Sequence, residues 1–134
     1  MPEKPSLPPV IELRVALTTR DYARLLKFYC AGLGIDPAQF WTDEHGQAAV
    51  LEMGRATLEI FDEGYAASVD QIEAGQRVSG PVRIAIQVPD LRSAVDRLLA
   101  LGAILVHPPV LTPWGDTNAR LRDPDGMQIT LYQK

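Results

Sequence analysis

The sequence has little that would favour an exported, membrane-bound or nucleic-acid-binding protein. Cys30 is the only cysteine among 134 residues, so no internal disulfide can form and the chain can fold in a reducing cytoplasm. A formal net charge of -4 argues against a broad nucleic-acid footprint. No apolar run reaches the length of a signal peptide or a membrane span. We therefore expect a cytoplasmic protein that partners neither nucleic acid nor membrane.

The chain also lacks the short motifs of several enzyme classes. Glycine-rich phosphate loops, CxxC pairs and nucleophile elbows are all absent. The hydrophobic fraction of 46% and the charged fraction of 22% are ordinary for a soluble globule. Residues 1–10 contain four prolines and are expected to form a flexible arm. We assign residues 11–134 to a single domain.

This domain contains the same pattern twice. A shift of 69 residues lays the segment 14–17 over 83–86 and places Asp21 over Asp90. The helical stripe Tyr22, Leu25, Leu26, Tyr29 falls on Leu91, Ala94, Val95, Leu98 at the same shift. Repeats at this long period indicate a duplicated supersecondary unit rather than a solenoid. We place module 1 at residues 11–62, a linker at 63–80 and module 2 at 81–134.

Each module is predicted to run strand, helix, strand, strand, strand. Asp21 is placed to cap the first helix, which Leu33 and Gly34 end, and Asp123 to Gly126 form a strong hairpin turn. The fold class is therefore α+β, with two tandem βαβββ modules forming a curved mixed sheet around a cleft. In module 1 we predict strands at 10–18, within 39–53 on both sides of a turn at 43–46, and at 56–62, with a helix at 21–31. The linker is predicted to hold a short helix at 66–74. In module 2 the predicted strands are 82–88, 104–111, 117–122 and 127–133, and the predicted helix is 90–101.

Strand alternation divides the residues between two faces of the sheet. The aliphatic set, expected to pack against the helices, is Leu13, Val15, Leu17, Leu58, Ile60, Ile84, Ile86, Val88, Ile129 and Leu131. The opposite set is Glu12, Arg14, Ala16, Thr57, Glu59, Phe61, Arg83, Ala85, Gln87, Gln128, Thr130 and Tyr132. It is polar with aromatics, which is typical of a cleft lining rather than a core.

The order and spacing of these pieces resemble the vicinal oxygen chelate superfamily, which includes glyoxalase I, extradiol dioxygenases and bleomycin-resistance proteins. The resemblance covers residues 11–133. It implies two modules whose sheets curve around a ligand cleft, commonly in a homodimer. The segments that carry it are Thr19-Arg20-Asp21, Lys27-Phe28-Tyr29, Leu33-Gly34, Val88-Pro89-Asp90-Leu91, Leu101-Gly102-Ala103, Pro113-Trp114-Gly115 and Asp123-Pro124-Asp125-Gly126.

The resemblance also implies where a metal would be bound. Family enzymes place His or Gln, Glu, His and Glu on the first and last strands of each module. Here those positions fall on Arg14, Glu59, Arg83 and Thr130. Arginine has five donors and no acceptor lone pair, and it stays protonated in proteins. We therefore expect no metal and no cofactor at these positions.

The same four residues suggest a different ligand. Two guanidinium groups beside Glu59 would leave a donor-rich floor with surplus positive charge, which suits a carboxylate, a phosphate or another oxygen-rich small molecule. Phe61 and Trp114 are expected to line the cleft, because aromatic side chains stack on flat ligands. The alternative is a structural ion-pair network in the space of a lost metal site.

Three function classes remain open. The favoured one is a metal-independent small-molecule-binding protein that encloses a polar or anionic ligand, because nothing supplies an acid–base pair with complementary roles. The second is a glyoxalase- or dioxygenase-like enzyme with an altered site, in which Glu59 is a general base and the arginines stabilise an oxyanion. The third is a structural or regulatory interaction module, which predicts a cleft filled by side chains.

Overall fold

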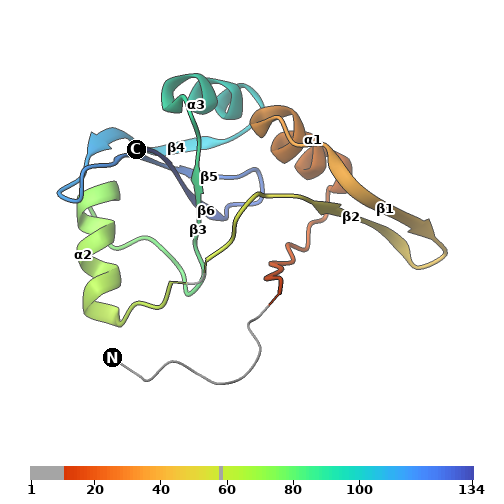
Figure 1. The fold of residues 1–134 in the computed structure, drawn as a ribbon, viewed down its shortest axis with the longest axis horizontal. Helices are drawn as coiled ribbons and strands as arrows, with labels where there is room; N and C mark the ends of the chain where they lie inside the picture. The colour runs from red at the N-terminus through yellow and green to blue at the C-terminus, as the bar shows by residue number, and fades with distance from the viewer. Residues whose placement is uncertain (1–10, 58) are drawn as a thin grey trace.

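The computed structural model of the chain describes residues 11–57 and 59–134, so the arm predicted at residues 1–10 and the core position Leu58 lie outside the described residues. The described residues form three helices and six strands (Figure 1). None of these three helices is both long enough and apolar enough to cross a membrane. In chain order the elements are α1 (Tyr22–Leu33), β1 (Pro37–Asp43), β2 (Gly46–Leu51), α2 (Glu63–Ala74), β3 (Ile84–Gln87), α3 (Leu91–Ala100), β4 (Ile104–Leu111), β5 (Thr117–Arg122) and β6 (Gln128–Gln133).

The second module has the predicted order of elements. Its four strands form one sheet in the order β3-β6-β5-β4, in which β3 runs parallel to β6 and the other neighbours are antiparallel. Each strand begins and ends within two residues of the predicted bounds. The turn between β5 and β6 is held by Asp123, whose Oδ1 accepts from the backbone N–H groups of Asp125 (2.9 Å) and Met127 (3.0 Å). Alternation and turn residues are local signals, and they were sufficient here.

The first module is less complete. The side chain of Asp21 caps α1 and Gly34 ends it in the left-handed region at φ 68, both as predicted. The β1–β2 hairpin turns at 43–46 and extends away from the four-stranded sheet (Figure 1). The strands predicted at 10–18 and 56–62 are not found, because residues 11–19, 56–57 and 59–62 have no regular structure. An extended segment becomes a strand only where a neighbour accepts its hydrogen bonds.

The α+β class and its mixed sheet are thus confirmed, although the sheet does not close around a cleft within the described residues. Helices α1 and α3 pack on one face of the four-stranded sheet (Figure 1). Of the aliphatic set, Val88, Ile129 and Leu131 are buried and Leu17, Ile84 and Ile86 pack against them. Leu13, Val15 and Ile60 are exposed instead, since their segments have no sheet to join. The buried core is Leu25, Phe28, Tyr29, Val88, Leu91, Ala94, Val95, Leu98, Ala103, Ala119, Leu121, Ile129 and Leu131.

Helix α2 lies on the opposite face of this sheet (Figure 1). It begins three residues before the predicted start, because the Asp62 carboxylate accepts the backbone N–H of Tyr65 at 2.8 Å and caps it there. Gly75, at φ 77, ends it. Its buried residues are Val69, Asp70, Glu73 and Ala74, so half of the face that it turns to the sheet is acidic.

Candidate functional site

The residues beneath α2 come from alternate positions of two neighbouring strands. Asn118 and Arg120 of β5 and Gln128 and Thr130 of β6 are all buried, and Arg120 lies directly opposite Thr130 in the register. The residues between them belong to the aliphatic core, so strand alternation turns these four side chains toward α2. The polar face that the sequence predicted therefore exists, and the linker helix covers it.

Arg120 is the centre of this face, with an exposed fraction of 0%. Its Nη1 donates to Asp70 Oδ1 at 2.9 Å and to Ser79 Oγ at 2.8 Å. Its Nη2 donates to Glu73 Oε1 at 2.8 Å, and its Nε donates to Thr130 Oγ1 at 3.2 Å. One buried guanidinium thus joins two strands to two carboxylates of α2.

Asp70 accepts hydrogen bonds from the sheet and from the loop that follows α2. Besides Arg120, its carboxylate accepts from the backbone N–H groups of Val78 (2.9 Å) and Ser79 (2.8 Å), and from Arg77 Nη1 at 2.9 Å. Burial by itself would raise the pKa of this carboxyl, but the hydrogen bonds from Ser79, Arg120 and Val78 outweigh it and hold the pKa well below its usual range. Asp70 is therefore an ionised carboxylate at neutral pH.

This depressed pKa predicts a pH-dependent effect of Asp70→Asn. A carboxyl whose pKa is lower in the folded state stabilises the fold above its unfolded pKa of about 3.9, and that stabilisation is lost as pH falls further. The charged groups facing it are Arg77 and Arg120, with Glu73 one turn along α2. We expect the loss of melting temperature in Asp70→Asn to be largest near neutral pH and to shrink below about pH 5. Melting curves of both proteins from pH 3 to pH 8 measure it.

The exposed Asp96 of α3 provides the matched control for this measurement. Asp96→Asn should follow the wild type at every pH, because an exposed carboxylate contributes little. A constant gap between wild type and Asp70→Asn across the whole range would contradict the assignment.

Of the four positions predicted to converge, the structure brings Arg83 and Thr130 together. Arg83 Nη1 donates to Thr130 Oγ1 at 2.5 Å and lies 4.0 Å from Glu73 Oε1. Burial lowers the pKa of Arg83, partly offset by the charge of Glu73. Thr130 Oγ1 in turn donates to Glu73 Oε1 at 2.9 Å. Glu73, rather than Glu59, is thus the carboxylate that faces Arg83.

Arg14 and Glu59 do not join this site. Arg14 is exposed, and its Nε pairs with Glu12 Oε1 at 3.0 Å. Glu59 is also exposed and has no ion pair within 4.0 Å in the described part of the chain, although its charge reaches Arg83 at longer range. The prediction that Glu59 lies between two arginines is therefore wrong. Both residues were assigned to strands that do not form, so neither is held against the sheet.

The two aromatic residues predicted to line the cleft also lie apart from Arg120. Phe61 packs against Tyr65, with ring centroids 4.9 Å apart, beside the start of α2. Trp114 lies in the β4–β5 turn and is 46% exposed. Neither ring makes a cation–π contact with an arginine within the described residues.

The donor set does not fit a divalent metal. Arg14, Glu59, Arg83 and Thr130 offer one carboxylate and one hydroxyl against two fixed cations, and only two of the four meet. Residues 11–57 and 59–134 contain no group of three or more His, Cys, Asp or Glu side chains arranged to hold an ion.

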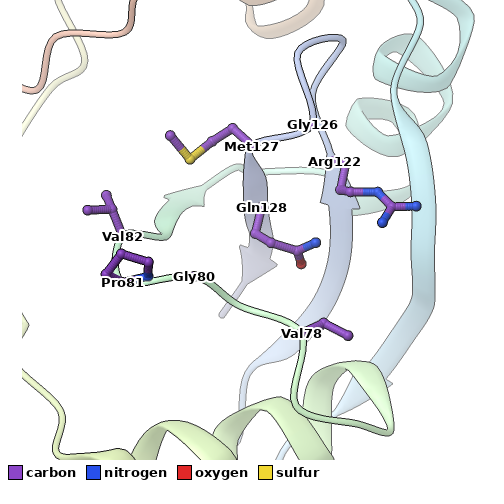
Figure 2. Close-up of a pocket in the computed structure, with 8 residues that line it drawn as sticks. All are labelled: Val78, Gly80, Pro81, Val82, Arg122, Gly126, Met127 and Gln128. Atoms are coloured by element: carbon purple, nitrogen blue, oxygen red, sulfur yellow. The ribbon is translucent and has the colours of Figure 1, made fainter.

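A hollow of about 460 Å³ adjoins the polar face (Figure 2). Gln128 belongs to both, because it lines the hollow and its Oε1 accepts from Arg120 Nη1 at 3.4 Å. The residues that line the hollow are Val78, Gly80, Pro81, Val82, Arg122, Gly126, Met127 and Gln128.

Inside the polar face, Asn118 Nδ2 donates to Glu73 Oε2 at 2.9 Å, whereas Asn118 Oδ1 has no hydrogen-bond partner among the described residues.

Sequence reasoning missed Arg120, Asp70 and Glu73. Arg120 could have been found from the alternation within 118–122, which puts it on the same face as Asn118. The acidic pair of α2 gave a weaker signal, because carboxylates three residues apart on a helix usually form a solvated face.

The comparisons with known proteins agree with this fold. The family profile described as "Glyoxalase/Bleomycin resistance protein/Dioxygenase superfamily" matches residues 13–131. No curated protein matches the chain.

Solved structures of similar fold include a hypothetical protein, SA1046, from S. aureus, with 17% identity, a TM-score of 0.61 and coverage of 94% of this chain and 95% of that one. TioX from Micromonospora sp. ML1 has 17% identity and a TM-score of 0.55, covering 92% and 96% of the two chains. A member of the glyoxalase/bleomycin resistance protein/dioxygenase superfamily from Sphaerobacter thermophilus DSM 20745 has 23% identity and a TM-score of 0.54, covering 93% and 98%. At these identities the likeness shows the fold alone.

The family profile runs from the segment before α1 into β6 and so covers most of the chain. The chain therefore belongs to the glyoxalase/bleomycin resistance protein/dioxygenase superfamily.

Proposed function

We propose that the protein binds a small polar or anionic molecule on the sheet face that holds Arg83 and Arg120, without a metal ion. The observation that carries the proposal is the convergence of four donor-bearing side chains from β5, β6 and the residue before β3, which are Arg83, Asn118, Arg120 and Thr130. Guanidinium groups beside amide and hydroxyl donors suit carboxylate or phosphate oxygens.

The chemistry of this face also favours binding over mere packing. Replacing a buried ion network by apolar side chains of similar volume is often neutral or stabilising, so a helix can be packed on a sheet without such a network. Buried and perturbed charges cluster at functional sites, and here they gather on the face that the fold leaves free of its aliphatic core.

A second candidate, a structural or regulatory module, is supported by one observation. Asp70 and Glu73 of α2 already satisfy Arg120, which is the filled face that this reading predicts. The enzyme alternative has less support, since its general base, Glu59, is exposed and contacts neither arginine in the described residues.

A panel of small anions, each paired with its neutral amide or ester, tests the proposal. At a concentration of 100 times Kd a ligand adds about 2.7 kcal/mol to the free energy of unfolding, which a thermal-shift measurement detects. We expect anionic members to raise the melting temperature and their neutral partners to leave it unchanged. Calorimetry would then give the affinity of each hit.

Two arginine variants locate the binding site. Arg83→Met should weaken binding by roughly 10- to 100-fold, since a charged hydrogen bond contributes about 1.5 to 3 kcal/mol. Arg92→Met is the matched control, because Arg92 is an exposed residue of α3, which packs on the other face of the sheet from α2. Equal affinity in wild type and Arg83→Met would place the ligand elsewhere.

We also predict that the purified protein carries no stoichiometric metal, because arginine occupies two of the four ligand positions that the family resemblance implies. Elemental analysis after purification without a metal-affinity step measures this. Roughly one equivalent of Zn, Ni, Fe or Mn per chain would contradict it.

We further propose a homodimer. The first and last strands predicted for module 1, at 10–18 and 56–62, carry exposed apolar side chains, among them Ile11, Val15 and Ile60. Strand β3 is an edge of the four-stranded sheet, and a second copy can supply the neighbouring strand that each segment needs. Light scattering should give twice the chain mass of 14.7 kDa. A monomer alone at tens of micromolar, roughly the working range of a specific interface, would count against it.

A further inference from the structure

Helix α2 is attached to the sheet mainly through charge. Its buried face consists of two carboxylates and two small apolar residues, whereas the four buried residues of α3 are all apolar. Val69 and Ala74, the apolar pair of α2, are not part of the core cluster. An attachment built from ion pairs is open to competition by any other anion that reaches the same cations.

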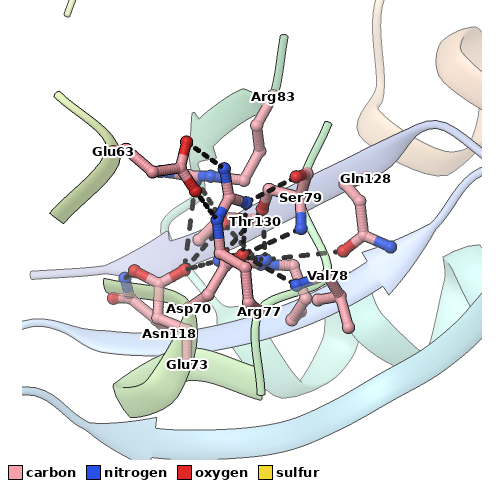
Figure 3. Close-up of polar contacts among 11 residues, drawn as sticks. Glu63, Asp70, Glu73, Arg77, Val78, Ser79, Arg83, Asn118, Gln128 and Thr130 are labelled. Atoms are coloured by element: carbon pink, nitrogen blue, oxygen red, sulfur yellow. Dashed lines mark hydrogen bonds and ion pairs between the residues drawn. The ribbon is translucent and has the colours of Figure 1, made fainter. Parts of the chain in front are cut away.

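The loop after α2 belongs to the same unit. Arg77, the backbone of Val78 and Ser79 all donate to Asp70, so residues 63–79 hold one another together (Figure 3). We call residues 63–79 the closing segment. Its polar bonds to the sheet all end on four side chains, which are Arg83, Asn118, Arg120 and Thr130.

The chain on each side of the closing segment has neither helix nor strand. This holds for residues 52–57 and 59–62 before it and for residues 80–83 after it. The segment can therefore leave the sheet without breaking a strand, as elements that close over binding sites do.

Two features of the face beneath it point to the ligand. Removing the closing segment takes away Asp70 and Glu73 and leaves two positive charges, on Arg83 and Arg120. A ligand with two negative charges would make this face neutral again. In addition, Asn118 is 4% exposed and its Oδ1 has no partner among the described residues, so it can accept a hydrogen bond from a ligand donor. The adjoining hollow of about 460 Å³ gives the rest of a ligand room.

We propose that a small dianionic ligand bearing a hydrogen-bond donor displaces the closing segment, and that Asp70 and Glu73 hold the site closed in its absence. The inference rests on the proposed function, since it assumes that the arginine-bearing face is the ligand site. Two carboxylates or one phosphate monoester have the required charge.

Hydrogen exchange of the wild-type protein tests the displacement. The probes are malate and glycerol 3-phosphate as dianions with hydroxyl groups, and lactate as a monoanion with a hydroxyl group, all at equal ionic strength. We expect a bound dianion to speed the exchange of α2 amides by roughly tenfold or more, while α1 and α3 keep their protection. Lactate should bind far more weakly and leave α2 protected.

The outcomes separate this inference from the proposed function. Binding of a dianion while α2 stays protected would overturn the displacement. Equal binding of lactate would overturn the dianion class. If no anion bound at all, the proposed function would fail and the inference with it.

A pair of variants provides a second readout. Glu73→Gln weakens the closed state, so dianions should bind roughly tenfold tighter, because apparent affinity follows the fraction of open molecules. Glu63→Gln is the control, since the Glu63 carboxylate is 80% exposed and, among the described residues, pairs with Arg77 alone. The affinity of this variant for dianions should equal that of the wild type. Unchanged affinity in folded Glu73→Gln would overturn the inference. If circular dichroism shows that Glu73→Gln does not fold, hydrogen exchange of the wild type alone decides whether a dianion displaces the closing segment.

Discussion

Arg120→Met is expected to destabilise the protein by about 3 to 5 kcal/mol, because it removes one partner of a buried ion network and leaves the others uncompensated. Asp70 and Glu73 would each lose their shortest contact with the sheet. For a chain of this size the loss corresponds to a fall in melting temperature of roughly 10 to 20 °C. Chemical denaturation and thermal melting both measure it.

Arg122→Met, two residues along the same strand, is the matched control. Arg122 is exposed, so its replacement should change the melting temperature by less than about 2 °C. If Arg120→Met melted within a few degrees of the wild type, the closing segment would not be held by this arginine.

Leu98→Ala is expected to destabilise the fold by about 2 to 5 kcal/mol through the cavity that it leaves. Leu98 belongs to α3 and is fully buried where this helix packs against α1. The packing at this point is close, because a Cβ on Gly32 would lie 2.3 Å from Leu98 Cδ2. Denaturant unfolding of the variant would show a lower midpoint with an unchanged slope.

Leu99→Ala controls for the loss of a leucine from α3. Leu99 is 36% exposed on the outer side of the helix, so its truncation should have a clearly smaller effect. Equal losses at positions 98 and 99 would mean that α1 and α3 do not meet as described.

The second module could be predicted from the sequence because its signals are local. Alternation through 117–122 and 128–133, with Asp123 and Gly126 in the turn between them, fixes a hairpin without reference to the rest of the chain. The outer strands of module 1 have the same alternation, but a strand also needs a neighbour. The sequence pattern does not show whether that neighbour comes from the same chain or from a second copy.

The candidate site was predictable only in part. Arg83 and Thr130 meet because Thr130 belongs to β6 and Arg83 directly precedes β3, the strand that pairs with β6; both strands were predicted. Arg14 and Glu59 lie in segments that residue alternation predicted to be strands but that have no regular structure. Glu73 was missed because its partner, Arg120, is 47 residues away along the chain, and helix periodicity does not reveal such a contact.

A crystal structure with the tightest-binding dianion tests most directly whether the arginine-bearing face is the ligand site. We predict ligand oxygens within hydrogen-bonding distance of Arg83 and Arg120, with Asp70 and Glu73 moved away from them. A ligand bound elsewhere, with Arg120 still bonded to both carboxylates of α2, would contradict the assignment.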